Sequence, residues 1–152
     1  MCFFCVRSTT PVGVKTVTKI YTFCERDGQS PFLSLFHQLD KKLQQKILKG
    51  LRCMALFPSY RAQPHVKHFS IERYSQLYEY RERIRILFRV IYTLDTAKNI
   101  ILLVPFVKKR DKDTQRALEL AVQRMETIRQ YPECRVELDI GGEVPVLIDR
   151  DI

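Results

Sequence analysis

The sequence predicts a single α+β domain in which helices pack on an antiparallel β-sheet. Stretches rich in β-branched residues alternate with stretches that carry apolar residues three and four positions apart, and turn signals separate them. The hydrophobic content of 45% and the charged content of 28% are typical of a globular chain. With 152 residues, the chain has the length of one domain and can form a core without disulfides or metal.

The first half of this domain is expected to form one strand and two short helices. Residues 15–24 are rich in Val and Thr, which favours a strand. Ser30, followed by a proline, indicates the start of one helix, and Asp40 indicates the start of a second that ends at about Phe57. Gly50 should weaken this second helix only slightly. Two linked helices predict an antiparallel helix hairpin.

The second half is expected to supply three consecutive strands and a closing helix. A polar loop over residues 58–70 leads to strands predicted at Leu77–Arg83, Ile84–Leu94 and Asn99–Lys108. Pro105 should lie near a strand end or at a bulge. A helix capped by Asp113 or Thr114 follows and carries an apolar stripe. The order is β-α-α-β-β-β-α, with the helices on one side of the sheet.

Two terminal segments differ from this central domain of residues 15–128. Residues 1–14 are interpreted as an N-terminal leader. Residues 129–152 are interpreted as an acidic tail that forms a β-hairpin around Gly141 and Gly142. One hypothesis is that this hairpin lies near a cationic site and moderates it. The alternative is that it extends the sheet at a distant edge.

The net charge of +9 favours an anionic partner, such as nucleic acid or a membrane surface. The charge is segregated, because residues 60–116 contain 13 basic and 6 acidic residues whereas residues 117–152 contain 4 basic and 8 acidic residues. The apolar stretch Met1–Val6 is far too short for a membrane span. We therefore expect no membrane association, and nucleic acid is the favoured partner.

The five cysteines do not match a zinc pattern, because Cys2 and Cys5 form a single CxxC pair and the other three are scattered. Reduced thiols are the simpler interpretation, and they suit a cytoplasmic protein. The sequence also has no phosphate-binding glycine-rich loop and no HExxH motif. We expect neither a cofactor nor a metal ion.

The many lysine and arginine residues on and near the predicted strands are the candidates for binding and cleaving RNA. RNA cleavage requires a proton to leave the 2′-hydroxyl, positive charge at the phosphate and a proton for the leaving oxygen. Arginine can hold the phosphate by bidentate contact, and a lysine among other cations can act as a base. Arg81, Arg83, Arg85 and Arg89 stand at alternating positions, and Arg81, Arg83 and Arg85 share one face if strand pairing is regular. The other candidates are Lys67, Lys108, Lys109, Arg110 and Lys112 as cations and His65 and His68 as an acid or base.

Several stretches resemble the phage-derived, HigB-like branch of the RelE/ParE toxin superfamily. GQSPFLSLFHQLDKKLQQKILKGLRCMALFP is similar to the two-helix opening of that branch. YEYRERIRILFRVIY is similar to its "YELR…YRVLY" strands. NIILLVPFVKKRDKDTQRALELAVQRM is similar to its "IVLLHGFVKKTQKTP" strand, loop and closing helix. The resemblance covers about residues 15–128.

This resemblance implies a toxin of a type II toxin–antitoxin pair that cuts mRNA on the ribosome without metal. It implies a RelE-like fold and a helix-turn-helix antitoxin as partner. By position, it assigns catalytic roles to Arg81, Arg85, Lys108 and Lys109, and it places Lys67 among the RNA-binding residues. Two alternatives stay open: a gyrase-directed toxin of the ParE type and a non-catalytic, phage-derived binding module.

Overall fold

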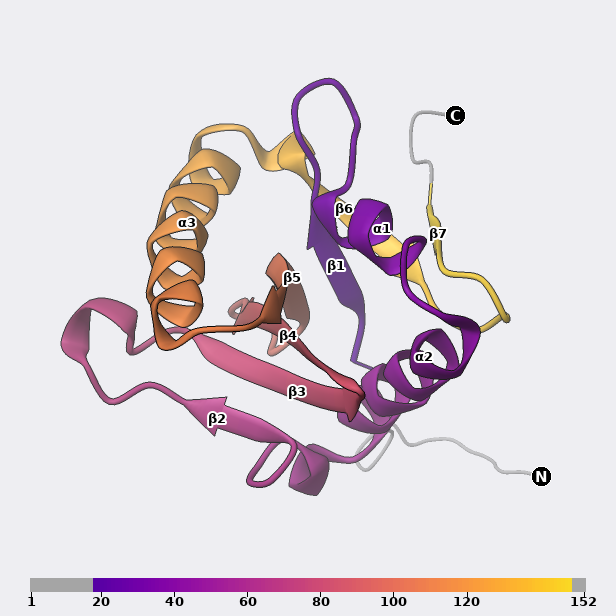
Figure 1. Cartoon of the computed structure of the whole chain (residues 1–152). Coiled ribbons are helices and arrows are strands. Elements are labelled where there is room, and N and C mark those ends of the chain that lie inside the picture. Colours follow the sequence, from indigo (N-terminus) through magenta and orange to yellow (C-terminus); the bar gives the residue numbers. More distant parts are fainter. Residues whose placement is uncertain (1–17, 149–152) are drawn as a thin grey trace, which may run out of the picture.

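The computed structural model describes residues 18–148 (Figure 1). The helices are α1 (Pro31–Phe36), α2 (Lys41–Leu56) and α3 (Asp111–Gln130). The strands are β1 (Ile20–Phe23), β2 (Val66–His68), β3 (Tyr78–Ile84), β4 (Ile86–Leu94), β5 (Ile100–Lys108), β6 (Arg135–Asp139) and β7 (Val146–Leu147). The predicted α+β class is confirmed. The leader predicted at residues 1–14 lies outside the described residues.

The strands form one seven-stranded sheet in the order β2-β3-β4-β5-β1-β6-β7. The strands β2 to β5 are antiparallel neighbours in chain order. Strand β1, however, pairs with β5 in parallel, with Ile20 opposite Ile100. The expectation of a purely antiparallel sheet is therefore wrong. Parallel pairing needs a long connection, and here two helices and three strands lie between the paired segments.

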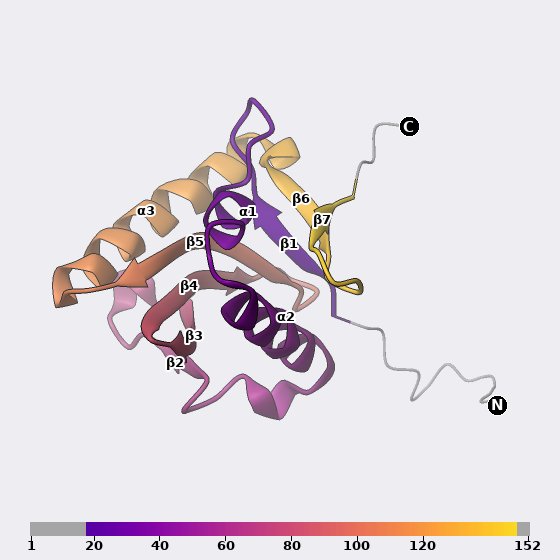
Figure 2. The same ribbon diagram turned by 45° about the vertical axis from the view of Figure 1, so that its right-hand side comes forward.

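Helices cover both faces of the sheet, so the expectation that they lie on one side is also wrong (Figures 1 and 2). The helices α1 and α2 enclose one apolar core, in which Ile47 meets Tyr80 and Tyr92. Helix α3 encloses a second core on the opposite face, where Leu118 lies with Ile91. The central strands are apolar on both faces, and each face therefore needs a cover.

The predicted starts of both early helices are confirmed. The Ser30 hydroxyl accepts the N–H of Leu33 at 3.1 Å, and the Asp40 carboxylate accepts the N–H of Leu43 at 2.9 Å. The two helices do not form the expected hairpin. Helix α1 packs mainly on β5, and helix α2 packs mainly on β3. Each helix is thus positioned by the sheet.

The three central strands begin and end within two residues of their predicted bounds. Ile91 lies opposite Val104 and Tyr92 opposite Leu102, so Leu103 is the extra residue of a β-bulge. Pro105 follows two residues later, as predicted for a proline near a bulge. The predicted loop over residues 58–70 contains the short strand β2, whose three residues give too little alternation to recognise.

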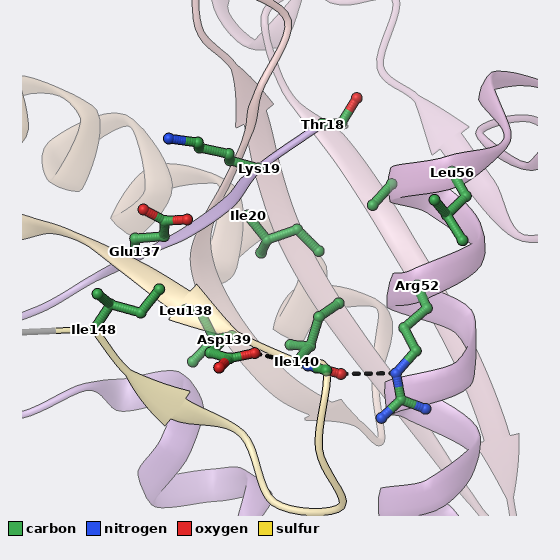
Figure 3. Close-up of a pocket in the computed structure, with 12 residues that line it drawn as sticks. Thr18, Lys19, Ile20, Arg52, Leu56, Glu137, Leu138, Asp139, Ile140 and Ile148 are labelled. Carbon is green, nitrogen blue, oxygen red and sulfur yellow. Dashed lines mark hydrogen bonds between the residues drawn. The ribbon is translucent and has the colours of Figure 1, made fainter. Parts of the chain in front are cut away.

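The acidic tail extends the sheet at the edge opposite β2 and β3. Strand β6 pairs with β1, with Thr22 opposite Val136, and β7 pairs with β6. The connection between β6 and β7 spans residues 140–145, which is wider than the predicted two-residue turn. Figure 3 shows the side chain of Arg52 on α2 reaching this loop, where it donates to the carbonyls of Ile140 at 2.7 Å and Gly142 at 2.6 Å. The tail is therefore anchored to the body of the domain.

A polar network joins the segment before β3 to α3. Arg73 donates two hydrogen bonds to the Glu119 carboxylate, at 2.9 and 3.0 Å, and the Tyr74 hydroxyl donates to the same group. The hydrogen bonds from Arg73 and then Tyr74 lower the pKa of Glu119 to about 2. Below that value the carboxylate is protonated, and its ion pair with Arg73 is lost.

Replacing Glu119 with glutamine should therefore change the pH dependence of stability. A carboxylate with a lowered pKa stabilises the fold fully above its ordinary pKa, and this contribution disappears as the pH falls toward about 2. We expect wild type to have a higher urea midpoint than Glu119→Gln at pH 7, and the two midpoints to converge between pH 4 and pH 2. Glu126→Gln removes an exposed carboxylate from the same helix and should show no such convergence. A constant difference across this pH range would contradict the prediction.

Candidate functional site

A cleft of about 610 Å³ lies at the edge of the sheet where β3 runs beyond β2. We call it the cationic cleft, because five of its eleven lining residues are lysine or arginine. Its lining residues are Lys46, Lys49, Gly50, Tyr60, Pro64, His65, Arg81, Glu82, Arg83, Leu87 and Arg89. They come from α2, from the loop before β2, and from β3 and β4.

Helix α2 contributes two lysines to the cleft because it packs very closely on β3. A Cβ atom at Gly50 would lie 1.8 Å from the Tyr80 hydroxyl, so this approach requires glycine. The Tyr80 hydroxyl donates to the buried Glu82 carboxylate at 2.5 Å. Lys46 donates to the carbonyl of Arg83 at 3.0 Å and lies 3.6 Å from Glu82. This contact fixes the amino group of Lys46 beside β3.

Three arginines share the face of the sheet that carries α3. Arg81 on β3 lies directly opposite Arg89 on β4, and Arg83 lies opposite Leu87. Opposed residues of an antiparallel pair are about 5 Å apart, so these guanidinium groups can reach one anion together. The cleft thus combines arginines from two strands with lysines from a helix.

A buried carboxylate organises the two opposed arginines. Glu79 is 1% exposed, and its Oε1 accepts the Nε–H of Arg81 at 2.9 Å. Burial lowers the pKa of Arg89, and Arg81 lowers it further, whereas Glu79 acts in the opposite direction. Glu79 therefore compensates part of the repulsion between two cations held side by side. Burying a charge is tolerated when such a partner is present.

Two buried polar atoms of this cluster have no hydrogen-bond partner. They are the Nε of Arg89 and the Oε2 of Glu79. An unpaired buried polar group costs free energy. The cluster that contains Arg81 and Arg89 is therefore held at some cost to the stability of the fold.

His65 is the imidazole of the cleft, and its position is fixed. Its ring stacks on that of Tyr60 with centroids 3.9 Å apart, and its carbonyl accepts the N–H of Arg81 at 2.9 Å. Burial raises the pKa of Tyr60, with a further contribution from Glu82. The phenol therefore stays protonated at neutral pH. An imidazole, which can donate or accept a proton, thus lies beside the cationic cluster.

Of the other residues expected on β3, Arg85 does not share the strand face of Arg81 and Arg83. It lies between Ile84 and Ile86, which pair with each other, and its φ of +65° belongs to the left-handed region. Arg85 is the turn residue between β3 and β4. The expectation of one continuous face is therefore wrong at this position, because regular pairing ends one residue earlier.

The four cations at the end of β5 and just after it are divided among three places. Lys108 lies opposite Leu87 and so shares the sheet face of Arg81, where it is 3.8 Å from Asp111. Lys109 and Arg110 line a different groove, described below. Lys112 is exposed in the first turn of α3. The structure thus brings Lys108 onto the face of the arginines and directs Lys109 away.

The first turn of α3 explains this division. The Asp113 carboxylate accepts the N–H groups of Lys109 at 2.8 Å and Arg110 at 2.9 Å, and these hydrogen bonds lower the pKa of Asp113. Because Asp113 reaches back in this way, the helix begins at Asp111, two residues before the predicted cap at Asp113.

Strand β2 carries the two remaining candidates. Lys67 lies opposite Glu79, and its amino group is 5.4 Å from the centre of the Phe69 ring. The His68 ring lies against Tyr78 and forms a 2.7 Å hydrogen bond with the carbonyl of Ser75. Neither residue lines the cationic cleft.

Sequence reasoning missed much of the surroundings of Arg81. The alternating arginines pointed to Arg89 as well, but the buried carboxylates and the lysines of α2 carry no such pattern. The one available signal was Gly50, because a glycine inside a helix often marks a close approach to another element. The missed residues are Lys46, Lys49, Tyr60, Glu79 and Glu82.

The acidic hairpin does not contribute to the cleft. No residue of 131–148 is among those that line it, and β4, β5 and β1 separate β3 from β6 in the sheet. The expectation that the hairpin lies near the cationic site is therefore wrong for residues 131–148, and a moderating effect of the tail stays a prediction. The alternative, an extension at a distant edge, is confirmed.

Residues 18–148 contain neither a candidate metal cluster nor a candidate membrane-spanning helix. This part of the chain has no cluster of three His, Cys, Asp or Glu side chains arranged to hold a metal ion. Within the same residues, no helix is both long and apolar enough to cross a bilayer. Cys24 and Cys134 are buried free thiols and Cys53 is a half-buried one.

Comparison with known proteins identifies the family. The model of the family "Phage derived protein Gp49-like (DUF891)" matches residues 34–126, which include α2, the strands β2 to β5 and most of α3. A search of curated proteins found no match. All the residues that line the cationic cleft fall within the matched range. The chain belongs to the phage-derived Gp49-like family, a HigB-like toxin family of the RelE/ParE superfamily.

Proposed function

We propose that this protein is the toxin of a type II toxin–antitoxin pair and that it cleaves mRNA on the ribosome. The observation that carries the proposal is the cationic cleft, in which three arginines from two strands, two lysines and one imidazole surround a single cavity. Family membership supports the same activity. We propose mRNA on the ribosome and a helix-turn-helix antitoxin as the partners.

The cleft contains groups for each requirement of metal-free RNA cleavage. Arg81, Arg83 and Arg89 would hold the scissile phosphate and stabilise the charge that builds up on it. His65 would accept the proton of the 2′-hydroxyl and then return a proton to the leaving 5′-oxygen. The tyrosine stacked on His65 limits the orientations of the imidazole. Products of this reaction are a 2′,3′-cyclic phosphate and a free 5′-hydroxyl.

The cations around the cleft are assigned to the RNA on either side of the scissile bond. Lys108 shares the face of the arginines, and Arg85 projects from the turn at the end of β3. We propose that both contact the phosphodiester backbone, as part of a sequence-independent electrostatic contribution. Lys67 on β2 would extend this contact along the same edge of the sheet.

Expression of the protein in a bacterium, alone and with its neighbouring gene, tests the proposal. We expect growth arrest when the protein is expressed alone and new mRNA 5′ ends within translated regions, bearing 5′-hydroxyl groups. Growth arrest with DNA damage and no new 5′ ends would instead indicate a gyrase-directed toxin. Normal growth would indicate a non-catalytic binding module. Either result would contradict the proposed activity.

A further inference from the structure

Strand β5 has an open edge along its second half. Strand β1 pairs only with residues 100–102 of β5, and after Phe23 the chain turns toward β6, where the N–H of Cys24 donates to the carbonyl of Cys134. On the other side, β5 stays paired with β4 as far as Lys108. No strand within residues 18–148 covers the edge from Leu103 to Lys108.

The helices α1 and α3 flank this edge from the two faces of the sheet (Figure 2). Their side chains and those of β5 line a groove. The groove has a volume of about 580 Å³, and we call it the β5 edge groove. Four consecutive residues of β5, Val104 to Val107, line its floor, which shows that it follows the strand. Pro31 and Leu35 come from α1, and Leu120 comes from α3. The α1 wall is therefore apolar, whereas the α3 wall combines Ala117 and Leu120 with the charged side chains of Asp113, Arg116 and Arg124.

Backbone groups of β5 point into this groove. Leu103 is the first residue beyond the pairing with β1, and its carbonyl accepts a 2.8 Å hydrogen bond from Arg124. In an antiparallel pair, successive residues direct their backbone groups alternately toward the partner and away from it. Pro105 has no N–H group, so it fits a position that points away from β4. Val107, two residues later, then points its N–H and carbonyl toward the groove.

The rim of the groove is cationic. Lys109, Arg110 and Arg116 are exposed there, and Asp113 is the one acidic residue of the lining. A second copy of this chain, pairing through the same edge, would bring these cations against each other, so self-pairing is disfavoured. A nucleic acid would use the cations but not the apolar side chains of the walls or the strand edge. An acidic polypeptide in extended conformation uses all three.

We propose that the β5 edge groove binds an extended acidic segment of a partner protein, which adds a strand to the sheet beside β5. The main chain of the segment would pair with Val107 and the Pro105 carbonyl, as in other cases of strand addition. Its alternate side chains would be apolar toward the walls formed by α1 and α3, and acidic toward the rim. This inference stands apart from RNA cleavage, because the groove follows β5 whereas the cationic cleft lies along β3 and β4, and the two share no lining residue.

Selection from a library of random twelve-residue peptides, displayed against the full chain, tests the proposal. We expect the enriched sequences to carry a net negative charge and alternating apolar residues. Replacing Arg116 with glutamate should weaken their binding at least fivefold. Arg129→Glu makes the same change at an exposed position near the other end of α3 and should leave binding within twofold of wild type. Bound peptide should slow hydrogen exchange at the Val107 amide at least tenfold.

Three results would overturn the proposal. The first is a selection that enriches no sequences, or enriches sequences without acidic residues. The second is equal loss of binding in Arg116→Glu and Arg129→Glu. The third is a result in which Arg116→Glu weakens the binding of single-stranded RNA but not the binding of peptide. That result would assign the groove to nucleic acid. Urea unfolding of both variants verifies that each one folds.

Discussion

Replacing Arg81 with alanine should lower the rate of ribosome-dependent mRNA cleavage about 100-fold or more, because removing one preorganised donor at a developing charge typically has that effect. Arg81 is the best-fixed cation of the cleft. Its side chain is bound by Glu79 at 2.9 Å, its backbone N–H donates to His65, and it lies directly opposite Arg89. It therefore needs little reorganisation to bind a phosphate. Primer extension on a translated mRNA measures the loss.

The same substitution leaves the buried Glu79 without its partner, and the fold must be checked separately. The side chain of Glu79 is only 2% exposed. Its carboxylate would become an unpaired buried charge, which is strongly destabilising. The double variant Glu79→Gln with Arg81→Ala replaces that charge by a neutral amide and should fold better than Arg81→Ala alone. Activity should stay low in both. Recovery of activity in the double variant would show that Arg81 serves only to neutralise Glu79.

Arg129→Ala is the matched control for charge. It removes an exposed arginine from α3, outside the residues that line the cleft, and should leave the cleavage rate within twofold of wild type. If Arg129→Ala and Arg81→Ala lose activity equally, net charge rather than the cleft governs RNA cleavage, and the proposed site would be wrong.

The part of the site that lies on β3 could be predicted because its pattern is local. The alternation of Arg81 and Arg83 follows from the two-residue period of a strand, and His65 stands in a loop that precedes it. The position of Arg85 could not be predicted. The sequence Arg-Ile-Arg-Ile continues the alternation through the turn, with no Gly, Asn or Asp to mark it.

The rest of the site depends on contacts between segments that are distant in sequence. Lys46 and Lys49 belong to the polar face of α2, and only the packing of that helix on β3 brings them to the arginines. The parallel pairing of β1 with β5 has the same origin, since it joins Ile20 to Ile100. Helix and strand signals are local, whereas the partner of each element is decided by burial over the whole fold.

Gly50→Ala should destabilise the protein by about 2–3 kcal/mol, although alanine is the better helix former by about 1 kcal/mol. The added methyl group would lie 1.8 Å from the Tyr80 hydroxyl and 2.8 Å from the Glu82 carboxylate, both buried in the contact between α2 and β3. Either α2 moves outward or the hydrogen bond between Tyr80 and Glu82 breaks. Urea unfolding monitored by circular dichroism measures the change.

Two further variants separate the clash from a general effect of losing a glycine. Gly142→Ala adds a methyl group where no atom lies within 4 Å, and it should change the unfolding free energy by less than about 0.5 kcal/mol. Tyr80→Phe removes the clashing hydroxyl, so Gly50→Ala should cost less in that background than in wild type. An equal cost in both backgrounds would contradict the assigned clash. Because an outward shift of α2 carries Lys46 and Lys49 away from Arg81, Gly50→Ala should also weaken RNA binding, whereas Gly142→Ala should not.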